Sequence, residues 1–347
     1  MAALNQLVPI PLLRLFFFFF FLASQLALAC DAGDRAVLLK IKAGFQNPGK
    51  FTSWDESVNC CTWYGVLCYP HDDGGRVTSL IYYNIDGASS GGLFGRLPDE
   101  LGDLPFLSSL VLGNHPNVYG VIPLTLTRLT RLSFLNLAHN SLSGALPSFL
   151  SQIHSLAVLN LSFNKFRGLI PPEFFNFAAL RYLSLEANDL EGVIPSTIGN
   201  LSKFPLPLHF TLSHNMLSGD IPAELGVPNW ETLDLSHNML TGDPTALFAA
   251  NKAITYMDLS FNKLEFDLTG IEFPIKLKKL ALQNNMITGS IPPQINKLDH
   301  LFGFNVSYNQ LCGIIPAGPV MNRFDDTSFF RNKCLCRSKD TCLAVGF

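Results

Sequence analysis

The chain has 347 residues and a weakly acidic balance, with 24 Lys and Arg against 27 Asp and Glu and a formal net charge of −3. Nucleic-acid-binding proteins usually carry a basic surface, so this composition argues against that class. The length alone would allow two ordinary domains, but an internal repeat takes precedence over that expectation.

The first 29 residues have the organisation of a secretory signal peptide. A single charge, Arg14, precedes a run of Phe and Leu, and the small-x-small segment Ala27–Ala29 stands before Cys30; this order is typical of a cleaved leader. The apolar run is short for a membrane anchor, and no later stretch is apolar for long enough to span a bilayer. We therefore expect a secreted protein with no transmembrane segment after signal cleavage.

Cysteines lie only at the two ends of the remaining chain, with none between Cys68 and Cys312. In a secreted protein an even, clustered set of this kind indicates disulfides. A zinc site is the alternative, but the chain has no C-x-x-C motif and the ends lack suitably spaced histidines. We expect an N-terminal cap at 30–75 and a C-terminal cap at 312–347, which also holds the last repeat turn, while the spacing alone leaves many pairings open. The cysteines are Cys30, Cys60, Cys61, Cys68, Cys312, Cys334, Cys336 and Cys342.

Residues 76–311 repeat the pattern LxxLxLxxNxLxGxIP in nine clear copies and one degenerate copy. Examples are "LAVLNLSFNKFRGLIP" at 156–171 and "LKKLALQNNMITGSIP" at 277–292. This period and this arrangement of Leu and Asn are the signature of a leucine-rich repeat. The sequence therefore predicts a leucine-rich-repeat solenoid, an α/β-type horseshoe whose parallel concave sheet has about ten 24-residue repeats;. The pivotal asparagines are Asn140, Asn164, Asn188, Asn215, Asn238, Asn262, Asn285 and Asn309.

The repeated phrase follows from the packing of one coil on the next. In "LDL" at 233–235 the alternation of a strand places both Leu side chains on one side and Asp234 on the other;. Stacked coils bury the apolar side chains in a core that no single coil could form. The asparagine after each strand is expected to turn inward, where its amide must find backbone partners in adjacent coils. Gly242 suits the tight bend that follows.

Binding residues are expected at the positions that the repeat leaves free, which face solvent on the concave sheet. Serines beside the strand leucines, such as Ser184, belong to these positions. A row of ten strands offers a surface large enough for a protein partner, and aromatic side chains suit the role of anchors there. The predicted partner-binding residues are Arg181, Tyr182, Glu186, His209, Glu231, Asp234, His237, Tyr256, Asp258, Phe261, Lys279 and Gln283.

The same surface offers two imitations of catalytic groups, and neither supports an enzyme. Asp234 and Asp258 on neighbouring strands imitate the carboxylate pair of a glycosidase. They lie on an open sheet, where we expect no cleft to exclude water or to raise a carboxyl pKa. Ser236 and His237 imitate a nucleophile and its base, but adjacent strand residues point to opposite faces. We expect a protein without catalytic residues, metal ions or cofactors.

Three stretches carry a resemblance to a family of plant proteins. The block "FTSWDESVNCCTWYGVLC" at 51–68 resembles the disulfide cap of plant leucine-rich-repeat proteins. Within 246–268 the expected G-x-I-P gives way to "EFDL", and the tail at 322–342 reads "NRFDDTSFFRNKCLCRSKDTC". Both features resemble those of the polygalacturonase-inhibiting proteins of plants, and the resemblance covers essentially the whole chain after the signal peptide.

The resemblance implies a secreted defence protein of the plant cell wall. The implied partner is a fungal or insect polygalacturonase, whose cleavage of pectin would be blocked, and cell-wall pectin is a second candidate partner. In the family, variable concave residues decide inhibition, and acidic residues are among them. The resemblance also implies the disulfide order Cys30–Cys60, Cys61–Cys68, Cys312–Cys334 and Cys336–Cys342.

Three N-x-S/T sequons mark candidate glycosylation sites at Asn160, Asn200 and Asn305;. Asn200 is expected to lie off the sheet. Asn160 and Asn305 occupy the middle of strands and are expected to point from the concave surface, where glycans would confine a protein partner to the stretch from Arg181 to Gln283. The alternative is that both sequons are by-products of the repeated phrase and stay empty.

Two other functions stay open at this point. A soluble recognition protein in development or receptor signalling would use the same concave surface, and a pull-down from wall extracts would separate it from an inhibitor. Ice binding would need a regular array of like residues along the coils. The central strand positions are mixed, since Asp234 and Asp258 stand between Thr211 and Ala281.

Overall fold

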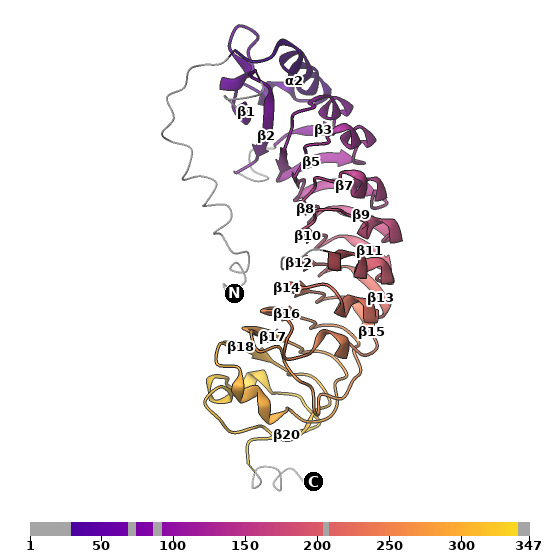
Figure 1. The fold of residues 1–347 in the computed structure, drawn as a ribbon, viewed down its shortest axis with the longest axis vertical. Helices are drawn as coiled ribbons and strands as arrows, with labels where there is room; N and C mark the ends of the chain where they lie inside the picture. The colour runs from indigo at the N-terminus through magenta and orange to yellow at the C-terminus, as the bar shows by residue number, and fades with distance from the viewer. Residues whose placement is uncertain (1–28, 69–73, 86–91, 204–207, 339–347) are drawn as a thin grey trace.

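The computed structural model describes residues 29–68, 74–85, 92–203 and 208–338. These residues form a curved solenoid, which confirms the predicted repeat fold (Figure 1). Short strands line the inner side of the curve, and short helices lie along its outer side (Figure 1). Of the predicted signal peptide, residues 1–28 lie outside the described ranges. None of the helices in those ranges combines the length and the apolar character that crossing a membrane requires.

An eleven-stranded sheet forms the concave face. Its strands pair parallel from β2 onward, while β1 is antiparallel to β2. Partners in register are equivalent positions of the repeat, such as Leu159, Leu183 and Phe210, so each repeat position forms a row along the solenoid. In order the strands are β1 (Val66–Cys68), β2 (Val77–Tyr83), β4 (Ser109–Gly113), β6 (Phe134–Asn136), β8 (Val158–Asn160), β10 (Tyr182–Ser184), β12 (Leu208–Thr211), β14 (Trp230–Asp234), β16 (Tyr256–Asp258), β17 (Lys279–Ala281) and β18 (Gly303–Asn305).

A second sheet of seven strands runs beside the concave sheet, and the repeat pattern alone does not predict it. Each of its strands lies between the concave strand and the outer helix of its coil, as the arrows on the right of the middle coils show (Figure 1). The strands are β3 (Phe94–Arg96), β5 (His115–Gly120), β7 (Asn140–Gly144), β9 (Lys165–Leu169), β11 (Asp189–Gly192), β13 (Met216–Asp220) and β15 (Met239–Thr241).

The second sheet stops where the sequence departs from the repeat. Gly219 and Gly242 form the bends of two regular coils at φ 75° and 78°, a conformation that glycine adopts without steric cost. In the next coil Phe266 stands at this position, and its side chain is buried. Phe266 does not have the positive φ of these glycines, so this coil lacks the glycine bend. Among the described residues beyond β15, the pairing outside the concave sheet is limited to an isolated bridge between Asp267 and Thr288 and to a two-stranded sheet of residues 312–314 and 334–336.

The outer side of the solenoid carries short 3-10 helices. Pro222 precedes η9 at φ −68° and Pro292 precedes η11 at φ −66°, because the fixed φ of proline and its missing N–H suit a helix start. The 3-10 helices are η1 (Pro48–Lys50), η2 (Cys60–Thr62), η4 (Asp99–Asp103), η5 (Leu124–Arg128), η6 (Ser148–Gln152), η7 (Pro172–Phe175), η8 (Ser196–Lys203), η9 (Ala223–Gly226), η10 (Thr245–Leu247), η11 (Pro293–Lys297), η12 (Met321–Arg323) and η13 (Asp326–Ser328).

The core holds the strand leucines and a ladder of asparagines, as the repeat predicts. Leu233 and Leu235 are fully buried. Asn238 donates from Nδ2 to the carbonyls of Leu212, Leu235 and Ser236 at 3.0, 3.1 and 3.2 Å. Its Oδ1 accepts the N–H of Leu217 at 3.0 Å. The amide therefore satisfies backbone groups of its own coil and of the preceding one. Each of the other pivotal asparagines also donates to a carbonyl of its own coil and to one of the preceding coil.

The second coil replaces the ladder asparagine with His115, which is fully buried. Its Nδ1 accepts the N–H of Leu93 at 3.2 Å, and its Nε2 lies 2.8 Å from the carbonyl of Tyr82. Burial lowers the pKa of His115, so the ring is neutral and can accept at one nitrogen while it donates at the other. A neutral histidine thus makes the two contacts to the preceding coil that asparagine makes elsewhere.

The N-terminal unit is organised around α2 (Ala32–Gly44) and a buried ion pair. Asp31 caps the helix by accepting the N–H of Asp34 at 3.0 Å. Asp34 is buried and accepts two bonds from the guanidinium of Arg76, at 2.9 and 2.7 Å, and one from the N–H of Val77 at 2.7 Å. These bonds satisfy the buried carboxylate and join the helix to the first long strand, β2.

Disulfides close both ends of the solenoid. Cys30 is bonded to Cys60, Cys61 to Cys68, and Cys312 to Cys334, the pairs that the family resemblance implies. The last of these joins β19 (Cys312–Ile314) to β20 (Cys334–Cys336), which pair parallel. Cys336 is also disulfide-bonded, and Cys342 lies outside the described residues.

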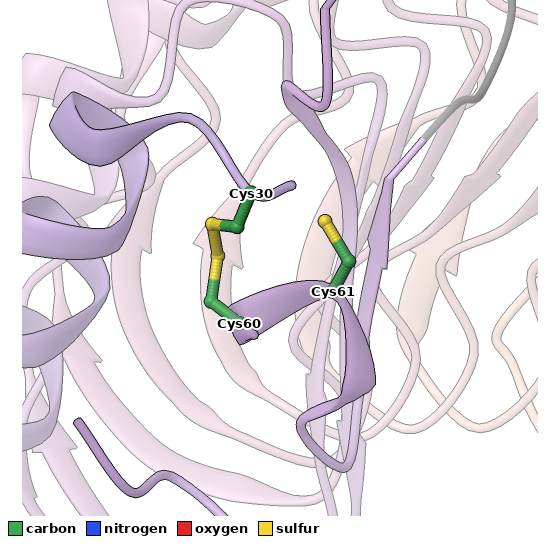
Figure 2. A group of neighbouring side chains, drawn as sticks. All are labelled: Cys30, Cys60 and Cys61. Carbon is green, nitrogen blue, oxygen red and sulfur yellow. A yellow bond between two sulfur atoms is a disulfide. The ribbon is translucent and has the colours of Figure 1, made fainter. Parts of the chain in front are cut away.

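Three sulfur atoms of the N-terminal cap lie close enough together to suggest a metal site. Figure 2 shows the side chains of Cys30, Cys60 and Cys61 gathered on one side of η2. Each of the three belongs to a disulfide. A cysteine binds a metal ion as a thiolate, so these disulfide-bonded sulfurs act as a structural staple.

Candidate protein-binding surface

The predicted partner-binding residues lie on five neighbouring concave strands, from β10 to β17, or on the bends beside them. Parallel register aligns Tyr182 with His209, and Tyr256 with Lys279. Asp234 is aligned with Asp258 on the next strand. These residues therefore form two rows along the surface, and whether they bind a partner stays a prediction.

Three carboxylates form an acidic cluster on this surface. Glu186 is half-buried, and burial raises its pKa, with a further rise from the charge of Asp234. Burial also raises the pKa of Asp234, and the charge of Asp258 adds to that rise. The sequence predicts no cleft that would raise a carboxyl pKa here, and the rises that do occur come from burial and from repulsion between the carboxylates;.

Asp234 and Asp258 also shape the backbone. Asp234 accepts the N–H of Ser236 at 2.9 Å, and Asp258 accepts the N–H and the hydroxyl of Ser260 at 3.1 and 2.5 Å. Asparagines at the same position of other coils accept from the residue two positions on: Asn136, Asn160 and Asn305. One carboxylate oxygen therefore has a scaffold role that an amide oxygen fills equally well.

The serines beside the strand leucines are not available to a partner. Ser184 is 2% exposed and Ser213 is 1% exposed. The expectation that these positions face solvent is wrong for them, because a small hydroxyl fits against the bend and bonds locally. Thr211 lies 3.0 Å from the hydroxyl of Ser213 in one such contact.

Two basic side chains lie against carboxylates of this surface. Lys279 Nζ lies 3.5 Å from Asp258 Oδ2, and His209 Nε2 lies 3.5 Å from Glu231 Oε2. Within the part of the chain that the structure describes, no ion pair joins a cation to Glu186 or Asp234. The unpaired negative charge of the predicted binding residues is therefore that of these two carboxylates.

A row of rings lies along the edge of the concave face. His237 and Phe261 stack at 4.1 Å between ring centroids, and His237 stacks on His214 at the same distance. Each ring precedes a ladder asparagine and has a positive φ, between 54° and 55°. His237 and Phe261 were predicted as binding residues, but their stacking was not. The sequence does contain a signal for this stacking, because in most copies the residue before the ladder asparagine carries a ring.

Gln283, one of the predicted binding residues, has a buried polar atom without a hydrogen bond in the part of the chain that the structure describes. Its Oε1 is buried and has no hydrogen-bond partner among the described residues. The equivalent position of the neighbouring coils holds Ser260 and Ser307, both of which bond locally. The residue aligned with Asp258 and Asn305 in this coil is Ala281, which has no side-chain acceptor, so the local bond of the serines has no counterpart at Gln283.

The catalytic alternative from Ser236 and His237 finds no support in the geometry. Ser236 is buried, whereas His237 is exposed and stacked between two rings. A nucleophile and its base need a hydrogen bond between them, and among the described residues none joins these two side chains.

The three sequons occupy two kinds of position. Asn200 lies on η8, and its Nδ2 donates to Asn176 Oδ1 at 2.9 Å. Asn160 and Asn305 lie at the ends of β8 and β18, and each accepts the hydroxyl of the sequon serine at 2.7 Å. Glycosylation at all three stays a prediction.

The raised pKa of Asp234 predicts a pH-dependent effect on stability. The folded state binds the proton of Asp234 more tightly than the unfolded state does. The stability that this protonation gives the fold is therefore present below the unfolded pKa and is lost as pH rises through the raised folded pKa. We expect Asp234→Asn to raise the urea midpoint at pH 7 and to have a much smaller effect near pH 3.5. Asp189→Asn, at an exposed carboxylate of β11, is the control. An equal gain at both pH values would contradict this assignment.

Comparison with family models places the repeats in a known class. A model described as a leucine rich repeat N-terminal domain matches residues 31–69, and leucine rich repeat models match residues 130–190, 229–250 and 276–298.

Curated relatives match over most of their length. Polygalacturonase inhibitor 2 of Arabidopsis thaliana is 47% identical over 88% of this chain and 90% of its own. A polygalacturonase inhibitor of Vitis vinifera is 43% identical over 88% and 89%. The leucine-rich repeat protein FLOR 1 of Arabidopsis thaliana is 42% identical over 93% and 96%.

Solved structures give the same fold. A plant ice-binding protein has a TM-score of 0.82 and 40% identity over 88% of this chain and 96% of its own. The structure of PEPR1–AtPEP1 has a TM-score of 0.61 and 27% identity over 86% of this chain and 48% of its own.

Proposed function

Because the chain belongs to the polygalacturonase-inhibitor family of leucine-rich-repeat proteins, we propose that it binds a polygalacturonase through its concave face and limits pectin degradation. The proposed setting is the plant cell wall, after secretion, and the proposed role is defence against fungal or insect enzymes. Several relatives are named inhibitors, which are not enzymes. The proposal extends that name to this chain and assigns the contact to the surface between β10 and β17.

The observation that carries the proposal is the acidic cluster of Glu186, Asp234 and Asp258. An enzyme that handles an anionic polymer is expected to have a basic rim around its cleft. Opposite potentials on the two surfaces speed their encounter and fix their relative orientation. Glu186 and Asp234, which have no ion-pair partner among the described residues, provide that potential at a cost in stability, which a basic partner would remove on binding.

The experiment replaces Asp234 and Asp258 by asparagine in one variant. The amide keeps the acceptor that holds each bend, as Asn136, Asn160 and Asn305 do in their own coils, so the solenoid is expected to stay folded. We expect association with an inhibited polygalacturonase to slow roughly tenfold at low salt and to lose most of its salt dependence, with a smaller change in dissociation. Stopped-flow or surface-plasmon measurements at several salt concentrations give both rates.

The control removes the same charge elsewhere. Asp189→Asn with Glu224→Gln changes exposed carboxylates on β11 and η9, off the concave sheet, and should leave association unchanged. A folded Asp234→Asn and Asp258→Asn variant that associates as fast as the wild type at low salt would contradict the assignment. A panel of fungal and insect polygalacturonases, none of which is bound or inhibited by the wild type, would overturn the proposed function itself.

The resemblance to a plant ice-binding protein does not favour ice binding here. The central row reads Ser184, Thr211, Asp234, Asp258 and Ala281 along neighbouring strands. Ser184 and Ala281 are buried, and the two aspartates carry charge. A thermal-hysteresis measurement on the purified protein checks this point, and we expect no activity.

A further inference from the structure

The residue before each ladder asparagine belongs to one row of the surface with a shared chemistry. All members have a left-handed backbone, with φ between 52° and 63°. With one exception, each side chain ends in a planar group, which is an amide, an imidazole, a phenyl or phenol ring, or a guanidinium. The exception is Ala187. In chain order the row is Asn114, His139, Phe163, Ala187, His214, His237, Phe261, Asn284, Tyr308 and Arg331.

Where two rings of this row are neighbours, they stack face to face. His139 and Phe163 have centroids 4.2 Å apart and planes 8° apart. His214 stacks on His237 at 4.1 Å and 11°, and His237 on Phe261 at 4.1 Å and 12°. The repeat of the strands therefore spaces these side chains at the thickness of an aromatic ring.

Ala187 interrupts the stack without interrupting the backbone. The N–H of Phe163 donates to the carbonyl of Glu186 at 2.8 Å, and the N–H of Ala187 donates to that of Ser213 at 2.9 Å. Backbone hydrogen bonds of the same kind join the other members of the row from coil to coil. Phe163 and His214 are two coils apart in this row. Their ring planes are therefore about 8 Å apart, which leaves room for one planar group in stacking contact with both.

The neighbouring position changes in the same coil. Ser162, Ser213, Ser236 and Ser260 are buried at the equivalent position of other coils, whereas this coil has the half-buried Glu186. One repeat thus loses a ring at one position and gains a carboxylate at the residue before it. Burial raises the pKa of Glu186, and the charge of Asp234 raises it further;. Among the described residues no ion pair with a cation offsets this.

We propose that the gap over Ala187 binds the guanidinium of an arginine on the partner protein, stacked between Phe163 and His214 and paired with Glu186. Arginine combines a planar face with a permanent charge and a fork of donors that fits a carboxylate. Lysine has the charge without the plane, and an aromatic side chain has the plane without the charge. The identity of the partner as a polygalacturonase rests on the proposed function, but the site itself does not.

The first test gives this coil the sequence that other coils have at the same positions. Glu186→Ser with Ala187→Phe turns 185–188 into Leu-Ser-Phe-Asn, which the chain has at 161–164 and 259–262. Phe163 and Phe261 tolerate the same backbone, at φ 53° and 55°. We expect this variant to fold, with unchanged or higher thermal stability, and to bind the partner enzyme at least tenfold more weakly. Ala187→Ser keeps the gap open and should bind as the wild type does. Unchanged affinity of the filled variant would overturn the proposal.

The second test needs no enzyme. N-acetyl-arginine amide is titrated into the whole protein while the imidazole resonances of His214 are followed by NMR. We expect a saturable shift that is absent in the filled variant and at least fivefold weaker with N-acetyl-lysine amide or N-acetyl-phenylalanine amide. An absent shift, or an equal response to lysine or phenylalanine, would refute the arginine site. A positive titration without inhibition of any polygalacturonase would instead refute the proposed function and leave the site standing.

Discussion

Replacing Asn238 by aspartate is expected to lower the free energy of unfolding by about 3–5 kcal/mol at neutral pH, the loss typical of an uncompensated buried charge. The side chain keeps its size, but a carboxylate can only accept hydrogen bonds. It would face the carbonyl oxygens of Leu212 and Leu235 at 3.0 and 3.1 Å, where the amide now donates. Each of these carbonyls would also lose its donor in a buried site.

The effect should depend on pH in a direction set by linkage. Burial and the surrounding carbonyls raise the pKa of the introduced carboxyl in the folded state above its unfolded value. Stability is therefore retained below the unfolded pKa and is lost as pH rises through the folded pKa. Urea unfolding at pH 4 and pH 7 measures both states. Asn251→Asp, at an exposed loop position, is the control, and a similar small effect of the two substitutions at pH 7 would show that the ladder contributes little.

Removal of the Cys312–Cys334 disulfide by serine substitution is expected to cost about 2–5 kcal/mol, the usual loss for a native bridge. The bridge joins β19 to β20, and Asn332, just before β20, donates to the carbonyls of Val306 and Phe329 at 3.0 and 2.8 Å. Phe329 lies against Phe304, with ring centroids 6.1 Å apart. Loosening β20 therefore uncovers the core of the last coil, and neighbouring coils depend on that contact.

Limited proteolysis and thermal melting measure this loss, and the Cys61–Cys68 pair supplies a comparison. That bridge closes a sequence separation of 7 residues, against 22 for Cys312–Cys334. A longer closed loop constrains the unfolded chain more strongly, so we expect the C-terminal pair to matter more. An intact C-terminal coil in the variant without Cys312 and Cys334, with wild-type resistance to protease, would show that the cap holds without its staple.

The sequence predicts the structural features that all coils share. The leucines, the inward asparagine and the glycine bend recur because each coil solves one packing problem, so a single phrase such as 230–244 predicts the contacts of all of them. The repeat pattern does not predict positions where a different residue type makes the contacts of the usual one. His115 takes the place of a ladder asparagine only because burial keeps its ring neutral.

The binding surface is harder to predict for the same reason. Strand alternation places Asp234 on the concave face, but it does not reveal that the carboxylate also accepts the N–H of Ser236. Nor does it reveal that crowding by Asp258 and by burial raises its pKa. The second sheet depends on the path of the chain after the asparagine, which a leucine pattern leaves undefined. The gap over Ala187 becomes visible only when the coils are compared with one another in space.

The asparagine bonds between coils all run in one direction along the chain. Asn164, Asn188 and the later members bind the coil that comes before them, both as donors and as acceptors, and Asn332 does so for the last coil. During synthesis each asparagine therefore leaves the ribosome after the groups it must bind. The nascent chain can lay each new coil on a finished one, starting from the N-terminal cap. The last coil alone waits for a residue outside the repeats, so completion of the C-terminal cap is the step that ends assembly.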